Sequence, residues 1–168
     1  MNSQFPTDEK FTPPSRFGIA DYSVMSTMNG LEFMQKIASG ELPSPPINER
    51  LAFKLVEVEE GRVLFIGLPD AGLLNPIGTV HGGFAATLLD SALACCVHTK
   101  CKIGYASTTV EFKVNFTRPI RPDIGEVYCE GKVIHSGRTI ATSQAILKDG
   151  NGKILAHGTE TCSIFKLP

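Results

Sequence analysis

One carboxylate, Asp90, lies in an otherwise uncharged stretch, residues 79–97, which reads TVHGGFAATLLDSALACCV. An unpaired carboxylate is strongly unfavourable in apolar surroundings, so Asp90 must be hydrogen-bonded, protonated or facing a wet cleft. A structural Asp bonded to a strand hydroxyl or to a neighbouring subunit is one explanation. A functional carboxylate is the better one, because acids in such unusual surroundings cluster at catalytic sites.

The residues before Asp90 offer hydrogen-bond donors of a second kind. Gly82 and Gly83 begin the predicted helix, whose first N–H groups lack intrahelical partners and carry the positive end of the dipole. Without side chains in the way, a ligand oxygen can approach these donors, as in an oxyanion hole. A tight turn packed on a sheet is the alternative explanation. His81 would cap this loop or bond near a substrate carbonyl, and Asn75 adds an amide, although Asn-Pro is also a turn signal.

Composition and charge exclude several classes of protein. The chain has 168 residues, 42% of them hydrophobic and 20% charged, which fits one globular domain. No window approaches the roughly 20 apolar residues of a membrane helix, and the polar, Pro-rich start has no apolar core of a signal peptide. We therefore expect a soluble, cytoplasmic protein without a membrane partner. A net charge of −1 gives no reason to expect a nucleic-acid partner.

Cysteine and histidine spacing predicts no metal site and no disulfide framework. The five cysteines are odd in number and contain no C-x-x-C pair, so we expect free thiols. The four histidines show no ligand spacing either. The charge is uneven along the chain, however, because residues 91–168 contain ten basic and six acidic groups. An anionic ligand near this half, or simply a solvated surface, would explain the bias.

Hydrophobic periodicity predicts the elements that must position these residues. An amphipathic helix over residues 26–39, capped by Ser26 or Thr27 and ended by Gly40, follows an extended arm over residues 1–22. An LPSPP linker leads to two strands within residues 49–69, joined at residues 59–61. A long apolar helix over residues 82–98 comes next. Four further strands are predicted at the ranges 105–118, 126–135, 138–148 and 153–165.

The order of these elements indicates an α+β fold. Short turns, among them the DGNG sequence of residues 149–152, require antiparallel pairing. Six strands form a sheet whose apolar face needs a cover, and the helix over residues 82–98 is the obvious one. We therefore predict an antiparallel six-stranded sheet wrapped around one long central helix, with an N-terminal helical extension, an arrangement that resembles the hotdog fold. The extension covers residues 1–47 and the hotdog domain residues 48–168.

The pattern N-P-x-G-x-x-H-G-G-x-x-x-x-L-x-D, from Asn75 to Asp90, closely resembles the signature of hotdog-fold acyl-CoA thioesterases of the phenylacetate-degradation (PaaI-like) type. TTVEFKVNFTRPI resembles the strand that follows in that family. The resemblance implies that Asp90 attacks the thioester carbonyl or activates the attacking water. It implies further that the Gly82 N–H holds the oxyanion, that Asn75 orients nucleophile and substrate, and that His81 lies beside the thioester.

The same resemblance implies a hydroxyl near the attacking water. A Ser or Thr early in the next strand, contributed by the partner subunit in some members, aligns with Thr109, and Thr108 is a close second because the loop length is uncertain by one. One branch of the family instead places a Ser or Thr four residues after the carboxylate. That position is Ala94 here, so this arrangement is absent.

The family binds coenzyme A across a dimer surface, with its phosphates held after the motif strand and around the next turn. Arg side chains suit phosphate because they are forked cationic donors, although each could equally be a solvent-exposed Arg. The implied coenzyme A positions are Arg118, Pro119, Arg121, Ser136, Gly137, Arg138 and Thr139.

The resemblance thus implies hydrolysis of an acyl-CoA to a carboxylic acid and coenzyme A, by water attack or through an anhydride. No cofactor is expected, since coenzyme A is part of the substrate. A homodimer with shared active sites, commonly assembled into a homotetramer, is implied as well. Separately from the resemblance, the apolar face of the segment over residues 26–39 suggests that this segment covers the acyl end of the site. An acyl-CoA hydratase or dehydratase and a non-catalytic acyl-CoA-binding protein are the alternatives on the same fold.

Overall fold

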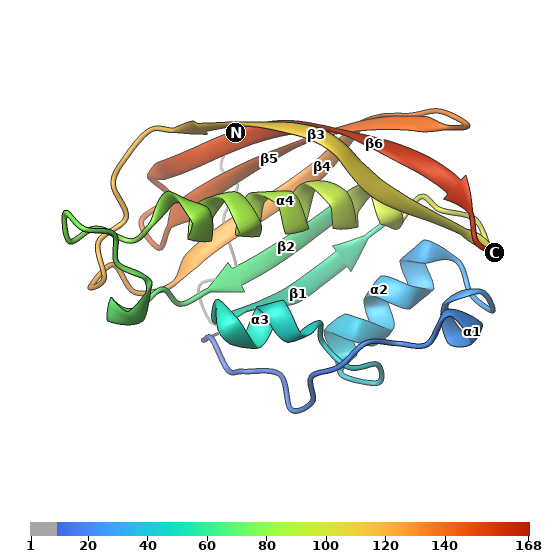
Figure 1. The fold of residues 1–168 in the computed structure, drawn as a ribbon, viewed down its shortest axis with the longest axis horizontal. Helices are drawn as coiled ribbons and strands as arrows, with labels where there is room; N and C mark the ends of the chain where they lie inside the picture. Colours follow the sequence, from blue (N-terminus) through green and yellow to red (C-terminus); the bar gives the residue numbers. More distant parts are fainter. Residues whose placement is uncertain (1–9) are drawn as a thin grey trace.

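A computed structural model describes residues 10–168, which form one curled antiparallel sheet with a long helix in its hollow (Figure 1). The strand order is β1-β2-β4-β5-β6-β3, so β1 and β3 are the edges. The strands are β1 (Phe53–Glu59), β2 (Arg62–Gly67), β3 (Tyr105–Phe116), β4 (Val127–Ser136), β5 (Ile140–Asp149) and β6 (Ile154–Lys166). The predicted hotdog fold is confirmed, and each strand begins and ends within a few residues of its predicted range.

The central helix α4 (Gly82–His98) has the bounds that its apolar sequence predicts. Eight of its side chains are buried, and it contacts all six strands. Small residues make this close packing feasible. A Cβ added at Gly131 of β4 would lie 2.1 Å from the Ala92 carbonyl oxygen, so only glycine lets helix and strand approach this closely.

The N-terminal segment forms three short helices along the β1 side of the sheet (Figure 1). They are α1 (Tyr22–Met25), α2 (Gly30–Ser39) and α3 (Pro46–Arg50). The prediction of a helix capped by Ser26 or Thr27 is wrong in its start, because Asn29 accepts from the Glu32 N–H and caps α2. Its end at Gly40, in the left-handed conformation, is confirmed.

The helices α1 and α3 were not predicted, since each is a single turn with no periodicity of its own. Helix α2 buries Phe33 and Met34 in the core cluster that also surrounds α4. Part of the predicted extended arm, residues 1–9, lies outside the described residues.

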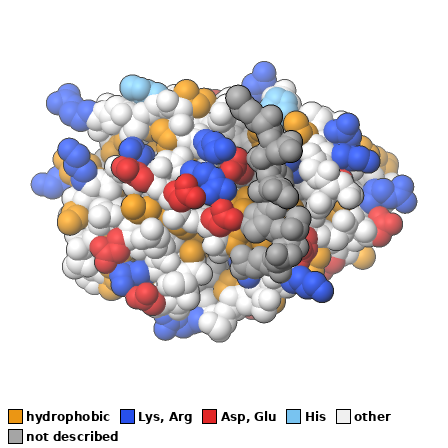
Figure 2. All heavy atoms as spheres, turned by 180° about the vertical axis from the view of Figure 1, so that it is seen from behind, with side chains coloured by type: hydrophobic (Ala, Val, Ile, Leu, Met, Phe, Trp, Pro, Cys, Tyr) orange, Lys and Arg blue, Asp and Glu red, His pale blue; other side chains and the backbone are white. Residues whose placement is uncertain are grey.

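Seen from behind, the molecule carries Lys, Arg, Asp and Glu side chains of both signs spread over its surface (Figure 2). Ion pairs tie neighbouring strands together, as where Arg62 meets Glu57 at 2.8 Å and Glu130 at 2.7 Å. Within residues 10–168, no helix combines the length and apolarity that a membrane crossing requires.

Candidate active site

Asp90 lies half-buried in the middle of α4 and is hydrogen-bonded within its own chain. The Thr109 hydroxyl, on the edge strand β3, lies 3.1 Å from Asp90 Oδ1. The same hydroxyl lies 3.1 Å from Oε1 of Glu160, which reaches it from β6. Asp90 therefore has the strand hydroxyl that its buried position requires, and it shares that hydroxyl with a second carboxyl group.

The geometry of β3 separates the two threonines. Thr109 faces α4, whereas Thr108 is exposed on the other face, as the alternation of a strand requires. The register against β6 shifts between Thr109 and Glu111, which marks a β-bulge directly after this contact. Thr109 is thus placed beside the Asp90 of its own chain, and Thr108 is left free to face another molecule.

The start of α4 offers one free N–H. His81 is the N-cap residue, and its Nδ1 accepts a hydrogen bond from the Gly83 N–H at 2.8 Å. The Gly82 N–H has no intrahelical partner and no acceptor in residues 10–168. This free donor lies where the helix dipole is positive, so it suits an oxygen that gains negative charge.

Asn75 shapes the loop that leads to this helix. Its Oδ1 accepts from the N–H groups of Ile77 and Thr79, and its Nδ2 donates to the Thr79 hydroxyl at 2.8 Å. A hollow of about 300 Å³ lies beside the loop, lined by Asn75, Gly82, Arg118 and Pro119 among others. The structure thus brings Asn75 and the free N–H of Gly82 together at one site.

Asp90 and Gly82 of one chain are far apart. They are eight residues apart on α4, a rise of about 12 Å at 1.5 Å per residue. A carbonyl under attack must lie about 3 Å from both the attacking group and the oxyanion donor. Within one chain, Asn75 and Gly82 therefore lie at one end of α4, apart from Asp90 and Thr109, while His81 lines a separate hollow with Gly83 and Thr87.

The seven predicted coenzyme A positions are all exposed, but they fall at opposite ends of α4. Arg118 and Pro119 line the hollow at its N-terminal end, where Arg118 Nη1 also donates to the Ile154 carbonyl. Arg121 pairs with Asp123 of the same loop at 3.5 Å. In the second group, Ser136 ends β4, and Gly137, Arg138 and Thr139 form the β4–β5 turn. Three of them line a hollow near the C-terminal end of α4 together with Lys100 and Lys102.

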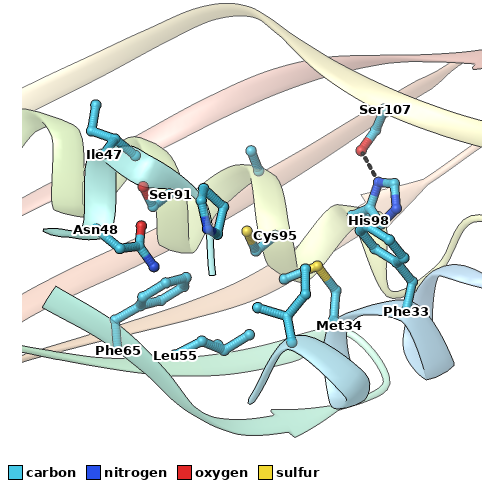
Figure 3. Close-up of a pocket in the computed structure, with 13 residues that line it drawn as sticks. Phe33, Met34, Ile47, Asn48, Leu55, Phe65, Ser91, Cys95, His98 and Ser107 are labelled. Atoms are coloured by element: carbon cyan, nitrogen blue, oxygen red, sulfur yellow. Dashed lines mark hydrogen bonds between the residues drawn. The ribbon is translucent and has the colours of Figure 1, made fainter. Parts of the chain in front are cut away.

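An apolar cavity of about 250 Å³ lies between α2, α3 and α4 (Figure 3). Its wall on α4 begins one residue after Asp90, with Ser91, Ala94, Cys95 and His98. Burial lowers the pKa of His98, and the pKa of the Cys95 thiol is raised to about 12, so both side chains are neutral near pH 7. The cavity is therefore an uncharged compartment beside the carboxylate.

The comparisons with known proteins agree with this geometry. A family model described as "Thioesterase superfamily" matches residues 77–156. Human acyl-coenzyme A thioesterase 13 is 30% identical over 113 residues, which cover 64% of this chain and 76% of the human protein. This chain belongs to the thioesterase superfamily.

Solved structures place the thioesterase among known folds. A thioesterase family protein from Silicibacter pomeroyi has a TM-score of 0.70 and 25% identity, and the match covers 79% of this chain and 98% of the other. The Escherichia coli PaaI protein of the phenylacetic acid degradation operon, with 18% identity over 82% and 99% of the two chains, shares the fold at a TM-score of 0.70.

One residue of the thioesterase site was missed by sequence reasoning. Glu160 is 2% exposed, inside the curled sheet, and burial raises its pKa to about 7. The signal was present in the strand pattern, because a period of two places Glu160 on the same face as the buried Ala156, Gly158 and Cys162. A charged side chain on the face of a strand that points into the core marks a functional or strongly paired position.

The thioesterase also carries other titratable groups within residues 10–168, the part of the chain that the structure describes. The five cysteines are free thiols, as predicted, and burial raises the pKa of each of them. In residues 10–168 no three His, Cys, Asp or Glu side chains are grouped so as to hold a metal ion.

Proposed function

We propose that this thioesterase hydrolyses acyl-CoA to a carboxylic acid and coenzyme A, with Asp90 as the attacking carboxylate or as the base that activates water. The placement of Asp90 supports this most directly, on a helix whose first N–H is free and beside the Thr109 hydroxyl. Family membership and the similarity to human acyl-coenzyme A thioesterase 13 support the same substrate class.

The proposed active site is shared between two copies of the chain. Strand β3 is an open edge, and two of its inward-facing aromatic side chains, Phe112 and Phe116, are 38% and 58% exposed. Phe112 lies opposite the buried Glu160 in the register with β6, so it faces the helix side of the sheet. Pairing of β3 with its copy would cover these rings and bring Asp90 of one protomer near Gly82 of the other.

The same pairing accounts for the two groups of predicted coenzyme A residues. An antiparallel β3 pair brings the C-terminal end of one α4 toward the N-terminal end of its partner. Residues 136–139 of one protomer would then lie on the same side as Arg118 and Arg121 of the other. Arg side chains from both would hold the phosphates, and assembly of two such dimers would give a tetramer.

Two routes fit the proposed chemistry. With Asp90 as base, it takes a proton from water as the water oxygen bonds to the carbonyl carbon. The C–S bond then breaks, and coenzyme A leaves as the thiolate. With Asp90 as nucleophile, its oxygen displaces the thiolate, and water hydrolyses the anhydride. In both routes the Gly82 N–H stabilises the oxyanion and no cofactor is needed. A single turnover in ¹⁸O-labelled water distinguishes them, because only the anhydride route can leave the label on Asp90.

The apolar cavity is the proposed compartment for the acyl group. Its 250 Å³ is below the roughly 300–1,000 Å³ of pockets that enclose drug-sized ligands, so it suits an acyl group and not a nucleotide. Helix α2 forms one wall through Phe33, Met34 and Ile37. The N-terminal extension would therefore help to select the acyl chain.

Thiol release from a panel of acyl-CoAs tests the proposal, with Asp90→Asn as the decisive variant. Loss of a positioned base lowers turnover by about 10²–10⁴-fold, while acyl-CoA binding is retained. Asp21→Asn is the matched control, because Asp21 caps α1 and Asn caps equally well, so its turnover should equal the wild type. Wild-type rates in Asp90→Asn would contradict the assignment.

A mixing experiment tests whether the site is shared. Gly82→Pro removes the N–H but suits the first position of a helix, and only the exposed Phe116 ring crowds the added carbon. When the Gly82→Pro and Asp90→Asn chains are co-expressed, half of the dimers are mixed, and each mixed dimer has one native site. Activity should recover to about a quarter of the wild-type value. Activity no higher than that of the separate variants would place the Gly82 and Asp90 of each site in the same chain.

A further inference from the structure

Glu160 is a second buried carboxyl group beside Asp90. It lies in the middle of β6 and is 2% exposed, and it makes no ion pair in residues 10–168. Its Oε1 is 2.9 Å from the Cys162 thiol, and its Oε2 is buried without a hydrogen-bond partner. The groups that face it are Asp90, Cys95 and Cys96 from α4, Thr109 and Phe112 from β3, Ser143 from β5 and Cys162 from β6. Asp90 is therefore the one other carboxyl group among these residues, and none of them carries a positive charge.

The hydrogen-bonding groups around Thr109 favour a proton on one of the two carboxyl groups. The Thr109 hydroxyl lies 3.1 Å from both Asp90 Oδ1 and Glu160 Oε1, yet it has one hydrogen to donate. Donation of this hydrogen to Asp90 leaves the Cys162 thiol as the remaining donor beside Glu160 Oε1. If Glu160 carries a proton, it can instead donate to the Thr109 oxygen while the Thr109 hydroxyl donates to Asp90, and both contacts are then full hydrogen bonds.

The surroundings indicate which carboxyl group carries this hydrogen. Glu160 is inside the sheet, whereas Asp90 is only partly buried, and burial disfavours the charged form of an acid. An ionised Glu160 would also leave the buried Oε2 charged and without a donor. The rise of the Glu160 pKa to about 7, caused first by desolvation and then by the charge of Asp90, agrees with this order.

We propose that Glu160 is a positioning residue that holds a proton for Asp90, donating to the Thr109 oxygen while the Thr109 hydroxyl donates to Asp90. The relay fixes the orientation of the Asp90 carboxylate toward the shared site. This inference rests on the proposed hydrolysis. Glu160 itself is too deeply buried to touch the thioester, so it acts through Asp90. Its replacement should therefore change kcat and leave substrate binding largely unchanged.

The relay has a consequence for the effect of pH. Once Glu160 ionises, two carboxylates compete for the single Thr109 hydrogen and repel each other, and Asp90 loses its fixed orientation. The wild-type kcat should therefore fall above about pH 7, by up to about tenfold for each pH unit, with little change in KM.

Two substitutions at Glu160 separate the relay from simple packing. Glu160→Gln keeps the shape and a permanent N–H donor, so its kcat at pH 6 should be near that of the wild type and should not fall above pH 7. Glu160→Ala has no donor and should have a low kcat at every pH. Glu111→Gln is the matched control on β3, because its exposed carboxylate accepts from Thr161 away from Asp90, and its profile should follow the wild type. An identical alkaline fall in Glu160→Gln and wild type would overturn the proposal.

An infrared pH titration tests the proton without turnover. The carbonyl band of a protonated carboxylic acid should be present at pH 6, disappear as the pH passes about 7, and be missing from Glu160→Gln. Loss of this band already below pH 5 would overturn the inference, even in an active hydrolase. Conversely, failure of the wild type to hydrolyse any acyl-CoA would overturn the proposed function, while the shared proton would still be seen in the infrared spectrum.

Discussion

Replacement of Glu160 by Gln should change how the stability of the fold depends on pH. In the unfolded chain Glu160 releases its proton near pH 4.5, whereas in the folded chain its pKa is raised to about 7. Between these two values the folded state binds more protons than the unfolded state. The free energy of unfolding therefore falls as pH rises, by up to 1.4 kcal/mol for each pH unit, and in total by about 3 kcal/mol.

The sign of this effect follows from the linkage relation. Stability from the neutral Glu160 is fully present below pH 4.5 and is lost by the time the pH has passed 7. Gln does not titrate, so the Glu160→Gln protein lacks this loss. The difference between the two free energies of unfolding should shift by about 3 kcal/mol in favour of Gln from pH 4.5 to pH 8.

Urea denaturation at pH 4.5, 6, 7 and 8 measures the difference, with the dependence on denaturant compared at each pH. Other titrating groups contribute almost equally to both proteins and cancel in the difference. The Glu111→Gln protein serves again as control, because its exposed carboxylate should give no such shift. Parallel curves for wild type and Glu160→Gln across this pH range would refute the proposal that Glu160 is neutral in the folded protein.

Three further predictions follow from the packing. Gly131→Ala should lower the free energy of unfolding by at least about 3 kcal/mol in urea denaturation, since the added methyl meets the α4 backbone at 2.1 Å. Ile37→Phe, which fills the apolar cavity, should lower kcat/KM for long acyl chains more than for short ones in thiol-release assays. Phe112→Asp should raise the dimer dissociation constant at least tenfold in light scattering, because it places a charge in the proposed β3 interface.

The sheet and its central helix could be predicted from the sequence because their patterns are local. Residues 82–98 are apolar on nearly every face, which requires a helix surrounded by the sheet, and the observed bounds agree. The strands alternate with a period of two, and the turn at residues 149–152 carries its own hairpin signal. In contrast, the short helices α1 and α3 have no period that sequence reasoning could detect.

The site was only partly predictable, because residues that are close in the sequence can be far apart in space, and the reverse. Asn75, His81, Gly82 and Asp90 belong to one local motif, but spacing along a helix also separates Gly82 from Asp90 by about 12 Å. Glu160 lies 70 residues beyond Asp90 in the chain, and its place beside Thr109 depends on the pairing of β6 with β3. Such a contact is a property of the tertiary fold, and no local pattern contains it.

The neutral Glu160 is a feature that packing alone does not explain. Gln would fill the same volume, donate a hydrogen bond to Thr109 and avoid the loss of about 3 kcal/mol above pH 7. A residue that weakens the fold near neutral pH, in contact with the attacking carboxylate, is expected where function and stability conflict. The two Glu160→Gln measurements therefore bear on each other: greater stability above pH 7 together with an unchanged pH–rate profile would leave Glu160 without a role in turnover. Greater stability above pH 7 together with a kcat that no longer falls there would show that the same proton affects both the stability of the fold and the reaction.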